Sequence, residues 1–460
     1  MPSPFHGIEI ASRALRAFQR GLDVAGHNIA NVNSRGYTRQ TVEYGPTEPM
    51  NVYHARLLSL GTGVGITSIN RIQDGFLQLR TWSSNGGLGR FEALASQLRQ
   101  VEGVFHEAGG GGIADALDRF FNAWSGLASN PGSDAARMEV QMAGRTLVGR
   151  VRGAYQDLMR IETQIAGQVA ATFDRIDTLT AKIAELNTRI QQQVGTGAQP
   201  NDLLDQRDLA VADLSRLVDV QSYAHANGSV SLYMGSLPLV DASGSRPIPR
   251  TYDASTFTLD AGTAQHKVRA GQLYGLFEAA NSVDAYQAQL DALADNLRTE
   301  INLLHRTGIN PNAATDIPFF RDPTGPGVSA ALDFELSAEV LADIKNIASG
   351  VSGNAGDGAL ALAIGQLRDQ SLAALGNRSF SGFFATLAAS VGRDVSSTGE
   401  SLKTQEAVAN QIEAQRQSVG GVSIDDEMAS MLRFQRSYQA AARALALFDE
   451  VTEDLISLIR

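Results

Sequence analysis

The sequence predicts a mainly α-helical protein with one small β insertion. Three observations indicate this. The chain begins with a long amphipathic helix pattern and ends with another, and several helical stretches lie between them. Only the stretch from about residue 218 to 270 changes to the alternating pattern of strands. The 460 residues suffice for roughly two to four domains at about 150 residues each.

The N-terminal pattern is a heptad seam. Its apolar residues recur at alternating steps of three and four, the period of a helix that packs along another helix. A large apolar side chain gains about 1.5–3 kcal/mol only where a partner covers it, so the seam requires a second helix. The seam consists of Ile8, Ala11, Leu15, Phe18, Leu22, Ala25, Ile29 and Val32.

The C-terminal pattern supplies a candidate partner for that helix. Ser423 is placed to cap its start, and Asp426 three residues later completes a capping-box pattern. Closing a loop of hundreds of residues costs only logarithmically with length, so we expect the two terminal helices to pair as a coiled coil. The apolar stripe consists of Ile424, Met428, Met431, Phe434, Tyr438, Ala441, Leu445, Phe448, Val451, Leu455 and Leu458.

The interior contains further helical patterns. An apolar seam runs from Leu158 to Ile190, and residues 273–305 and 383–419 are also typical of helices, the latter with a weaker stripe. Gly- and Pro-rich stretches at 108–112, 130–132 and 195–200 indicate turns or flexible connections.

The β insertion begins at about Val218. "NGSVSLYM" followed by "SLPLV" predicts a strand pair, and "TYDASTFTL" predicts one more strand. A second short mixed segment spans 318–336. We expect three domains: a coiled-coil rod domain of 1–35 with 422–460, a long-helix middle domain of 36–217 with 271–421, and an outer β domain of 218–270.

Composition removes several classes of function. The net charge of −11 and the scarcity of aromatic residues argue against nucleic-acid binding. No apolar run reaches the 18 or so residues of a membrane span, and the N-terminus has no secretory signal pattern, so the residues alone favour the cytoplasm. The chain has no cysteine, which excludes disulfides, thiolate metal sites and cysteine nucleophiles.

The chain shows no pattern of a catalytic or cofactor site. The seven histidines are too scattered for a zinc motif. Asp202, Asp205 and Asp208 could hold a hard cation from one helical face, but we favour acids near the positive end of a helix that begins after Pro200. "GTGVGI" at 61–66 lacks the spacing of a dinucleotide loop and predicts a turn. We therefore expect a non-enzymatic protein without cofactor or metal.

The stretch "GHNIANVNSRGYTRQ", residues 26–40, hereafter the corner, ends the first helix. Asn28 and Asn31 flank the apolar seam, where an amide can fix register. Asn33 and Gly36 tolerate positive φ and allow a sharp turn, which Tyr37 can anchor before an extended segment begins at Arg39. The residues by themselves favour an ordinary helix end.

The corner also carries a resemblance. "ANVNSRGYTRQ" resembles the signature of bacterial flagellar rod, hook and hook-associated proteins at Ala30, Asn31, Gly36 and Tyr37, although Ser34 stands where threonine is usual. The C-terminal helix resembles the ending of the same group, with Gln435, Tyr438 and Ala441 in the expected places.

Interior segments narrow the resemblance. Residues 120–147, 201–208 and 418–427 are similar to the first hook-associated proteins, the hook–filament junction proteins. So is "GTGVGITSINRIQDGFL", residues 61–77, at Arg71, Ile72, Asp74 and Phe76. The β insertion is small for that family.

The resemblance implies a structural axial protein of the flagellum that joins hook to filament and is needed for filament assembly. It implies export by the flagellar type III apparatus without a cleaved signal, which replaces the cytoplasmic expectation with an extracellular one. Implied partners are further copies of the chain, the hook protein, the next hook-associated protein and an export chaperone on the C-terminal helix. The expected assembly interface comprises Ile8, Leu15, Phe18, Leu22, Ile29, Val32, Met431, Phe434, Tyr438, Leu445, Phe448 and Leu455.

Three alternatives remain. A hook or distal rod protein shares both terminal patterns, but the 120–208 similarity favours the junction protein. Flagellin lacks the asparagine–glycine–tyrosine corner. A secreted cell-wall hydrolase would need a catalytic arrangement within 210–340, where the acids and the isolated His225 and His266 form no recognisable one.

Overall fold

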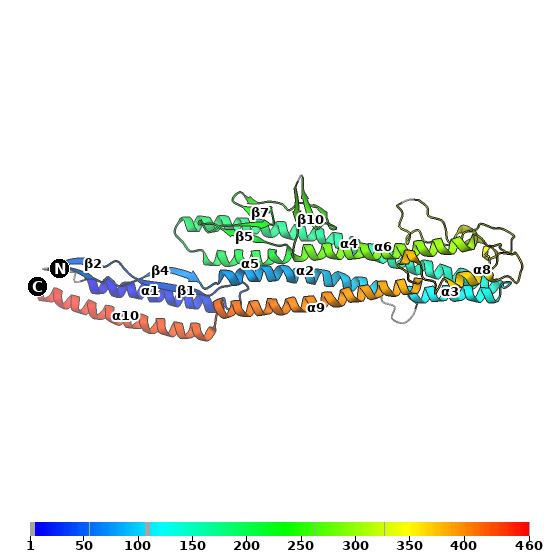
Figure 1. Ribbon diagram of the computed structural model, residues 1–460. Helices are drawn as coiled ribbons and strands as arrows, with labels where there is room; N and C mark the ends of the chain where they lie inside the picture. Colours follow the sequence, from blue (N-terminus) through cyan, green and yellow to red (C-terminus); the bar gives the residue numbers. More distant parts are fainter. Residues whose placement is uncertain (1–4, 55, 106–110, 263, 326, 460) are drawn as a thin grey trace.

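The computed structural model describes residues 5–54, 56–105, 111–262, 264–325 and 327–459, and it shows an elongated molecule (Figure 1). The first helix, α1 (His6–Ala30), and the last, α10 (Ile424–Ile459), lie side by side at one end. Long helices extend from there to a loop-rich end, and the β insertion lies on one side of them (Figure 1). The predicted mainly α fold with paired terminal helices and a β insertion is confirmed.

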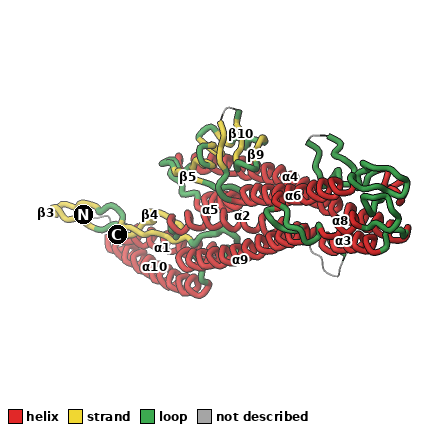
Figure 2. The backbone as a smooth tube through the Cα atoms, turned by 45° about the vertical axis from the view of Figure 1, so that its right-hand side comes forward, coloured by secondary structure: helices red, strands yellow, loops and turns green. Residues whose placement is uncertain are grey.

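We call the end that contains α1 and α10 the terminal rod. The two helices are antiparallel, because Asn28 bonds Glu427 near the inner end while Gly7 lies against Phe448 near the outer end. Strands β1 (Gln40–Pro46) and β4 (Val64–Arg71) form an antiparallel ribbon along α1. Strands β2 (Met50–His54) and β3 (Arg56–Leu60) pair at the tip, where Figure 2 shows them beyond the helix ends.

The middle of the molecule is a bundle of long helices. These are α2 (Gly75–Phe105), α4 (Asp134–Gly195), α5 (Asn201–Leu217), α6 (Gly271–His305) and α9 (Phe380–Gly420). The predicted helices at 158–190, 273–305 and 383–419 are confirmed, and α4 begins 24 residues before Leu158 (158 − 134), where Ser133 caps its first turn. Ile161, Ile165, Ile176, Ile183 and Ile190 of the predicted seam are buried.

Several helices of the bundle approach so closely that only glycine fits between them. A Cβ atom added at Gly89 of α2 would lie 2.0 Å from the carbonyl oxygen of Arg216, and one at Gly275 of α6 would lie 2.1 Å from that of Arg90. Arg90 then spans the α2–α6 contact with a bidentate ion pair to Glu278, at 2.6 and 2.7 Å. Close packing thus joins the start of α6 to α2 and to the end of α5.

The far end of the bundle encloses an aromatic core. It is built from α3 (Ile113–Ser129), the end of α6, α8 (Ala359–Gln366) and the segment 317–336, with short α7 (Ala338–Ala342), η1 (Ile344–Asn346) and η2 (Ala373–Leu375) around it. The predicted mixed segment at 318–336 contains an isolated antiparallel bridge between Phe320 and Leu336, with no longer strand among its described residues. Its fully buried rings include Phe120, Phe121, Trp124, Phe319, Phe320, Phe334 and Phe380.

A buried histidine completes this core. His305 Nδ1 lies 2.7 Å from the carbonyl oxygen of Ile317, and its Nε2 lies 3.1 Å from the amide nitrogen of Ala348. A neutral ring that is protonated on Nδ1 satisfies both contacts, whereas a second proton on Nε2 would oppose the amide. Burial, with a smaller contribution from Arg306, lowers the pKa of His305 to about 4.

We expect this histidine to make the fold sensitive to acid. The folded-state pKa lies below the unfolded value, so the stabilisation is fully present above about pH 6.5 and is lost as the pH falls toward 4, about 3 kcal/mol in total. Urea unfolding at a series of pH values measures this through the fluorescence of the two tryptophans, of which Trp124 has its ring centroid 6.0 Å from that of the imidazole. His305→Gln should abolish that part of the pH dependence and His225→Gln, at an exposed position, should keep it; an unchanged slope in His305→Gln would contradict the assignment.

The β insertion packs on α4. Strands β5 (Gln221–Ala224), β6 (Val230–Met234), β7 (Leu237–Asp241) and β8 (Gly244–Ser245) form one antiparallel sheet. The second sheet contains β9 (Thr251–Asp253), β10 (Thr258–Ala261) and β11 (Ala264–Lys267). The predicted pair at 227–240 is confirmed as β6 and β7. The prediction of one strand at 251–259 was wrong, because Asp253 accepts hydrogen bonds from the Ser255 backbone and hydroxyl and Phe257 has φ +57°, which turns the chain into a hairpin.

Two predicted turns are confirmed. Residues 130–132 connect α3 to α4, and 195–200 connect α4 to α5, with Gly197 at φ +80°. Of the predicted connection at 108–112, residues 108–110 lie outside the described residues, while Gly111 has φ +97°. In the "GTGVGI" stretch, Gly63 has φ +104° and β4 begins at Val64, as a turn into a strand.

Candidate functional site

The corner ends α1 with side-chain bonds and a glycine turn. The side-chain amide of Asn31 donates to the carbonyl oxygen of His27 at 3.0 Å and so caps the last turn of the helix. Ser34 donates to Asn31 Oδ1, also at 3.0 Å. The chain then reverses at Gly36, which has φ +83° and packs against Leu209 of α5, while Asn33 keeps a negative φ. The predicted sharp turn is confirmed at Gly36 alone.

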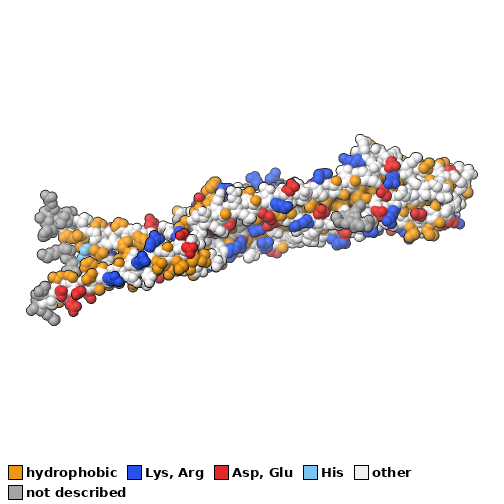
Figure 3. Space-filling model, turned by 90° about the horizontal axis from the view of Figure 1, so that it is seen from below, with side chains coloured by type: hydrophobic (Ala, Val, Ile, Leu, Met, Phe, Trp, Pro, Cys, Tyr) orange, Lys and Arg blue, Asp and Glu red, His pale blue; other side chains and the backbone are white. Residues whose placement is uncertain are grey.

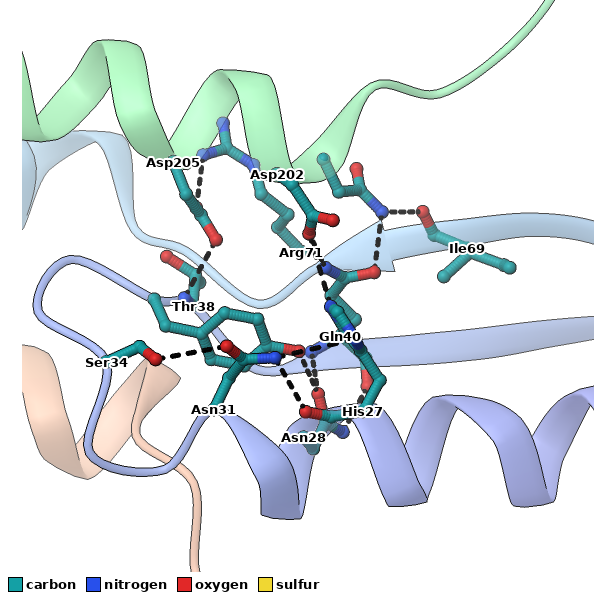
Figure 4. A network of polar contacts seen from close by, with 12 residues as sticks. His27, Asn28, Asn31, Ser34, Thr38, Gln40, Ile69, Arg71, Asp202 and Asp205 are labelled. Carbon is teal, nitrogen blue, oxygen red and sulfur yellow. Dashed lines mark hydrogen bonds and ion pairs between the residues drawn. The ribbon is translucent and has the colours of Figure 1, made fainter.

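Asn28 is the centre of the corner, with only 1% of its surface exposed. Its amide exchanges two hydrogen bonds with the Gln40 backbone: Nδ2 donates to the carbonyl oxygen at 2.9 Å, and Oδ1 accepts from the amide at 3.0 Å. The Tyr37 hydroxyl donates to the same Oδ1 at 2.7 Å, which confirms Tyr37 as the anchor of the turn. Asn28 therefore holds the first residue of β1 against the last turns of α1 (Figure 4).

A buried carboxylate joins α10 to the same point. Glu427 of α10, with 3% of its surface exposed, accepts from Asn28 Nδ2 at 3.1 Å and from Arg39 Nε at 2.6 Å. The charge is thus paired and hydrogen-bonded, as a buried carboxylate requires. Residues 28 and 39–40 thus meet residue 427, which lies 399 positions after Asn28, in one polar contact.

Two of the three predicted carboxylates of α5, Asp202 and Asp205, face the corner (Figure 4). Asp202 accepts from the Gln40 side chain at 2.9 Å, and Asp205 accepts from the Thr38 backbone amide at 3.0 Å. Arg71 of β4 bonds Asp205 at 2.7 Å and Asp208 at 2.9 Å. These acids therefore bind the corner and its neighbouring strand, and the described residues contain no group of three or more side chains placed to hold a metal ion.

Burial shifts the titration of this site. Burial, and then the negative charges of Asp202, Asp205 and Glu427, raise the pKa of the Tyr37 hydroxyl well above its usual value. Burial also raises the pKa of Asp205, with partial compensation from Arg71 and the Thr38 amide. The Asp205–Arg71 pair is almost fully enclosed, so removal of one partner would leave an uncompensated charge. Both pKa shifts follow from the close packing of the corner, α5 and α10.

The connection between α9 and α10 passes through the same place. The Arg39 amide donates to the carbonyl oxygen of Gly420 at 3.0 Å, and the Ile72 amide donates to the carbonyl oxygen of Arg39 at 2.8 Å. A Cβ atom at Gly420 would lie 2.4 Å from the carbonyl oxygen of Ile72. Ser423 then caps α10 by accepting from the Asp426 amide at 3.4 Å, as predicted. The corner therefore fixes the point at which the terminal rod joins the middle bundle.

The large seam residues of α1 are not its most buried ones. The face that is closed off consists of Ala11, Ala17, Gly21, Ala25 and Asn28. Gly21 admits the Phe434 ring and the Tyr44 hydroxyl, which a Cβ atom would meet at 2.9 and 2.4 Å. Small side chains thus let the two helices approach. The predicted interface residues Ile8, Leu15, Phe18, Leu22, Ile29 and Val32 are all half-buried.

The predicted residues of α10 are also only partly covered. Met431, Phe434 and Leu445 are half-buried, while Tyr438, Phe448 and Leu455 are 37%, 42% and 45% exposed. Of the motif residues, Asn31, Gly36 and Tyr37 form the corner, and Ala30 is the exposed last residue of α1. Gln435 is exposed and its side chain makes no hydrogen bond to another described residue. Further apolar side chains exposed on α10 are Met428, Leu432, Leu447, Val451 and Ile456.

Comparisons with known families match both ends and the middle of the chain. Residues 98–320 match the flagellar hook-associated protein FlgK helical domain. Residues 8–38 match the flagella basal body rod proteins, and 419–458 match the C-terminal part of the flagellar basal body rod FlgEFG proteins. The terminal matches thus coincide with the terminal helices, the corner and the start of α10.

Relatives match nearly the whole chain. Flagellar hook-associated protein 1 of Bacillus subtilis (strain 168) is 29% identical over 503 aligned positions, which cover 99% of each chain. This chain is therefore similar over nearly its whole length to the flagellar hook-associated protein 1 family. Flagellar hook-associated protein 1 of Escherichia coli (strain K12) is 25% identical and covers 98% of this chain and 99% of its own length. The family is one of structural flagellar proteins.

A solved structure supports the same fold. The flagellar hook junction protein FlgK from Burkholderia pseudomallei matches with a TM-score of 0.62 at 18% identity, over 75% of this chain and all of that one. The fold seen here is therefore one that this family adopts.

Proposed function

We propose that the chain is a structural axial protein of the bacterial flagellum that joins the hook to the filament and is needed for filament assembly. One structural observation supports this most: the terminal rod keeps large apolar side chains in solvent although its two helices are already paired. Leu447 is 62% exposed, and Met428, Leu432 and Val451 are each more than half exposed. Contiguous exposed apolar surface marks a protein interaction site.

The corner gives this surface a defined direction. Arg71 and Thr38 bond Asp205 of α5, and Gln40 bonds Asp202, so the rod has a fixed position on the middle bundle. An adaptor needs such a fixed element because it must present one surface to the hook and another to the filament.

We propose the domain limits of the sequence expectation with one change. The sequence expectation gives 1–35 with 422–460 as the rod domain, 36–217 with 271–421 as the middle domain and 218–270 as the outer β domain. The ribbon of β1 and β4 lies along α1, so we assign residues 40–71 to the rod.

Partners and location follow from the same proposal. The rod contacts further copies of the chain, the hook protein and the next hook-associated protein. Export proceeds through the flagellar type III apparatus without a cleaved signal, with a chaperone on the exposed apolar face of α10. The protein acts without catalysis, and the carboxylates of α5 support this because they are bonded to the corner and β4. No helix in the described ranges has the length and hydropathy to cross a bilayer.

Immunogold electron microscopy tests the proposed position. An antibody against the chain should label isolated hook–filament assemblies at the boundary between hook and filament. Label along the whole hook, or below it, would instead identify a hook or distal rod protein.

Charged substitutions on α10 test the proposed interface. We expect Leu445→Asp and Phe448→Asp to prevent incorporation of the chain into the flagellum while the middle bundle still folds. Burying an unpaired carboxylate in a subunit contact costs roughly several kcal/mol. Negative-stain microscopy of a complemented deletion strain gives the fraction of cells with filaments, and circular dichroism checks the fold. Arg189→Asp on the exposed face of α4 is the control. Normal filaments with both α10 variants would show that this stripe is not the interface.

A further inference from the structure

A groove with an arginine rim runs between α1 and the β1–β4 ribbon. Its volume is about 550 Å³. Arg16 and Arg20 lie on its rim, and Ala17, Val64 and Ile66 provide an aliphatic floor. Arg13 also lines it and is held there by the Thr47 hydroxyl at 3.3 Å and the Thr62 carbonyl oxygen at 3.2 Å. We call this surface the arginine groove.

The cations of the groove are barely neutralised. Arg20 lies 3.5 Å from Asp23, and both side chains are largely exposed. Arg13 and Arg16 have no ion-pair partner among the described residues. A net charge of −11 makes such a basic concavity unusual on this chain. The groove therefore offers an aliphatic floor and free positive charge at once.

The outer end of α10 has the opposite character. Asp449, Glu450, Glu453 and Asp454 are all exposed there, and none has an ion-pair partner within the described part of the chain. Val451, 54% exposed, lies among them, and Leu455, 45% exposed, follows them. We call residues 449–455 the acidic end. Figure 3 shows acidic side chains gathered at the tip of the rod and basic ones further along it.

The acidic end cannot reach the arginine groove of its own chain. Gly21 lies beside Phe434 and Gly7 beside Phe448, so Arg16 is level with about residue 439 of α10. Glu453 lies about 14 residues further out, which is about 20 Å at 1.5 Å per residue. Complementary surfaces therefore occur on one rod but at different heights.

We propose that the acidic end of one copy docks in the arginine groove of a second copy that is displaced by about 20 Å along the rod. This rests on the proposed function, since it assumes that the chain assembles with itself. A helix with apolar and acidic side chains fits a groove with an aliphatic floor and a basic rim. The contact joins two different faces, so it is heterologous and repeats from one copy to the next.

Charge also selects the displacement. Two rods placed side by side at equal height would bring the arginines of α1 level with Arg436 and Arg443 of the neighbour's α10, and like charges repel. A shift of about 20 Å replaces this repulsion with attraction. Each exposed ion pair contributes little and is screened by salt, so the charges set the register while the apolar contacts supply most of the affinity.

A second arrangement would use α10 alone. Arg436 and Arg443 lie on the same outward stripe of α10 as Glu450 and Asp454, since these positions repeat at steps of seven, seven and four. Two antiparallel copies could pair through that stripe. Such a contact uses one face twice and closes as a dimer, which cannot continue an assembly. The proposed function therefore favours the groove.

Charge exchange tests the pairing in a deletion strain that is complemented with the full chain. We expect Arg16→Glu with Arg20→Glu, and separately Glu450→Arg with Glu453→Arg, each to reduce the number of filamented cells at least tenfold. All four changes together should restore most filaments. Arg150→Glu with Arg152→Glu, at exposed positions of α4, is the matched control and should have no effect. Failure of the four-fold variant to regain filaments, with normal export and circular dichroism, would overturn the pairing.

Cysteine cross-linking tests the geometry, because the natural chain has no cysteine. The variants Arg16→Cys/Glu453→Cys and Arg20→Cys/Glu450→Cys are incorporated into hook–filament assemblies and oxidised. We expect a ladder of dimers, trimers and larger species on non-reducing gels from at least one pair, and at most dimers from each single variant. The variant Arg436→Cys/Glu450→Cys tests the antiparallel α10 arrangement, and a dimer as its only cross-linked product would overturn the proposal. The absence of multimers from both groove pairs, in assemblies that contain the chain, would also overturn it. Absence of the chain from the junction would instead refute the proposed function.

Discussion

Gly89→Ala is expected to destabilise the middle bundle by at least about 3 kcal/mol. The new methyl group would lie 2.0 Å from the carbonyl oxygen of Arg216 and 3.1 Å from the amide nitrogen of Gln272. Both are backbone atoms, so no side chain can rotate away, and the end of α5 and the start of α6 must move away from α2. Overpacking of this kind costs more than a typical substitution.

Gly103 provides the matched control in the same helix. A Cβ atom there meets nothing within 4 Å, so Gly103→Ala should stabilise the protein by roughly 0.5–1 kcal/mol through helix propensity alone. Urea unfolding followed by the circular dichroism signal of helix gives the free energy of unfolding of both variants. Equal stability of the two variants would show that α2 does not approach α5 and α6 as closely as described.

Asn28→Ala is expected to loosen the contact of α1 with β1 and α10 inside the terminal rod and to reduce filamented cells at least tenfold. The substitution removes all four bonds of the Asn28 side chain, to the Gln40 amide, the Gln40 carbonyl, the Tyr37 hydroxyl and Glu427. Each buried group that loses its partner costs about 1–3 kcal/mol, and Glu427 keeps only Arg39. Electron microscopy of a complemented deletion strain counts the filaments.

Asn33→Ala controls for the loss of an asparagine from the corner. Asn33 is exposed, and its side chain makes no hydrogen bond to another described residue. This variant should assemble normally, and immunoblots of the medium should show equal export of both. Normal filaments with Asn28→Ala would mean that the corner does not hold the rod in the assembled state.

The long helices could be predicted because their apolar residues keep a regular period. The seam from Leu158 to Ile190 and the capped stripe from Ser423 both specify helices without tertiary information. Helix α2 was not predicted, because glycine and serine interrupt its apolar pattern. In the structure α5, α6 and α9 cover it. Its buried faces contain Ser84, Gly86 and Gly89, and such small residues carry no hydrophobic period.

The site could be predicted only where local chemistry specifies it. Gly36 and Tyr37 were identifiable because a turn needs positive φ and an anchor. Glu427 was missed, because an acid in the first turn of a helix is an ordinary feature and nothing local distinguishes it from Asp425 and Asp426. Arg39 and Arg71 were missed as ion-pair partners because the acids that they bond lie 388 and 134 residues away in the sequence.

The position of the α1–α10 contact also needed the structure. A heptad seam predicts that large side chains fill the contact, whereas Ala11, Gly21 and Ala25 are the residues that α10 and the ribbon cover. The large residues Ile8, Leu15, Phe18 and Leu22 remain half-buried. An apolar period alone therefore does not tell which of its residues the partner helix covers.

Deletion of the gene tests the central claim most directly, with electron microscopy of the cells and an assay of flagellin in the medium. We expect bare hooks and unpolymerised flagellin in the medium, because filament subunits would lack the adaptor on which to assemble. Expression of the full chain in the deletion strain should restore the filaments. Cells without hooks would place the protein further down the axis, and cells with normal filaments would contradict the junction function altogether.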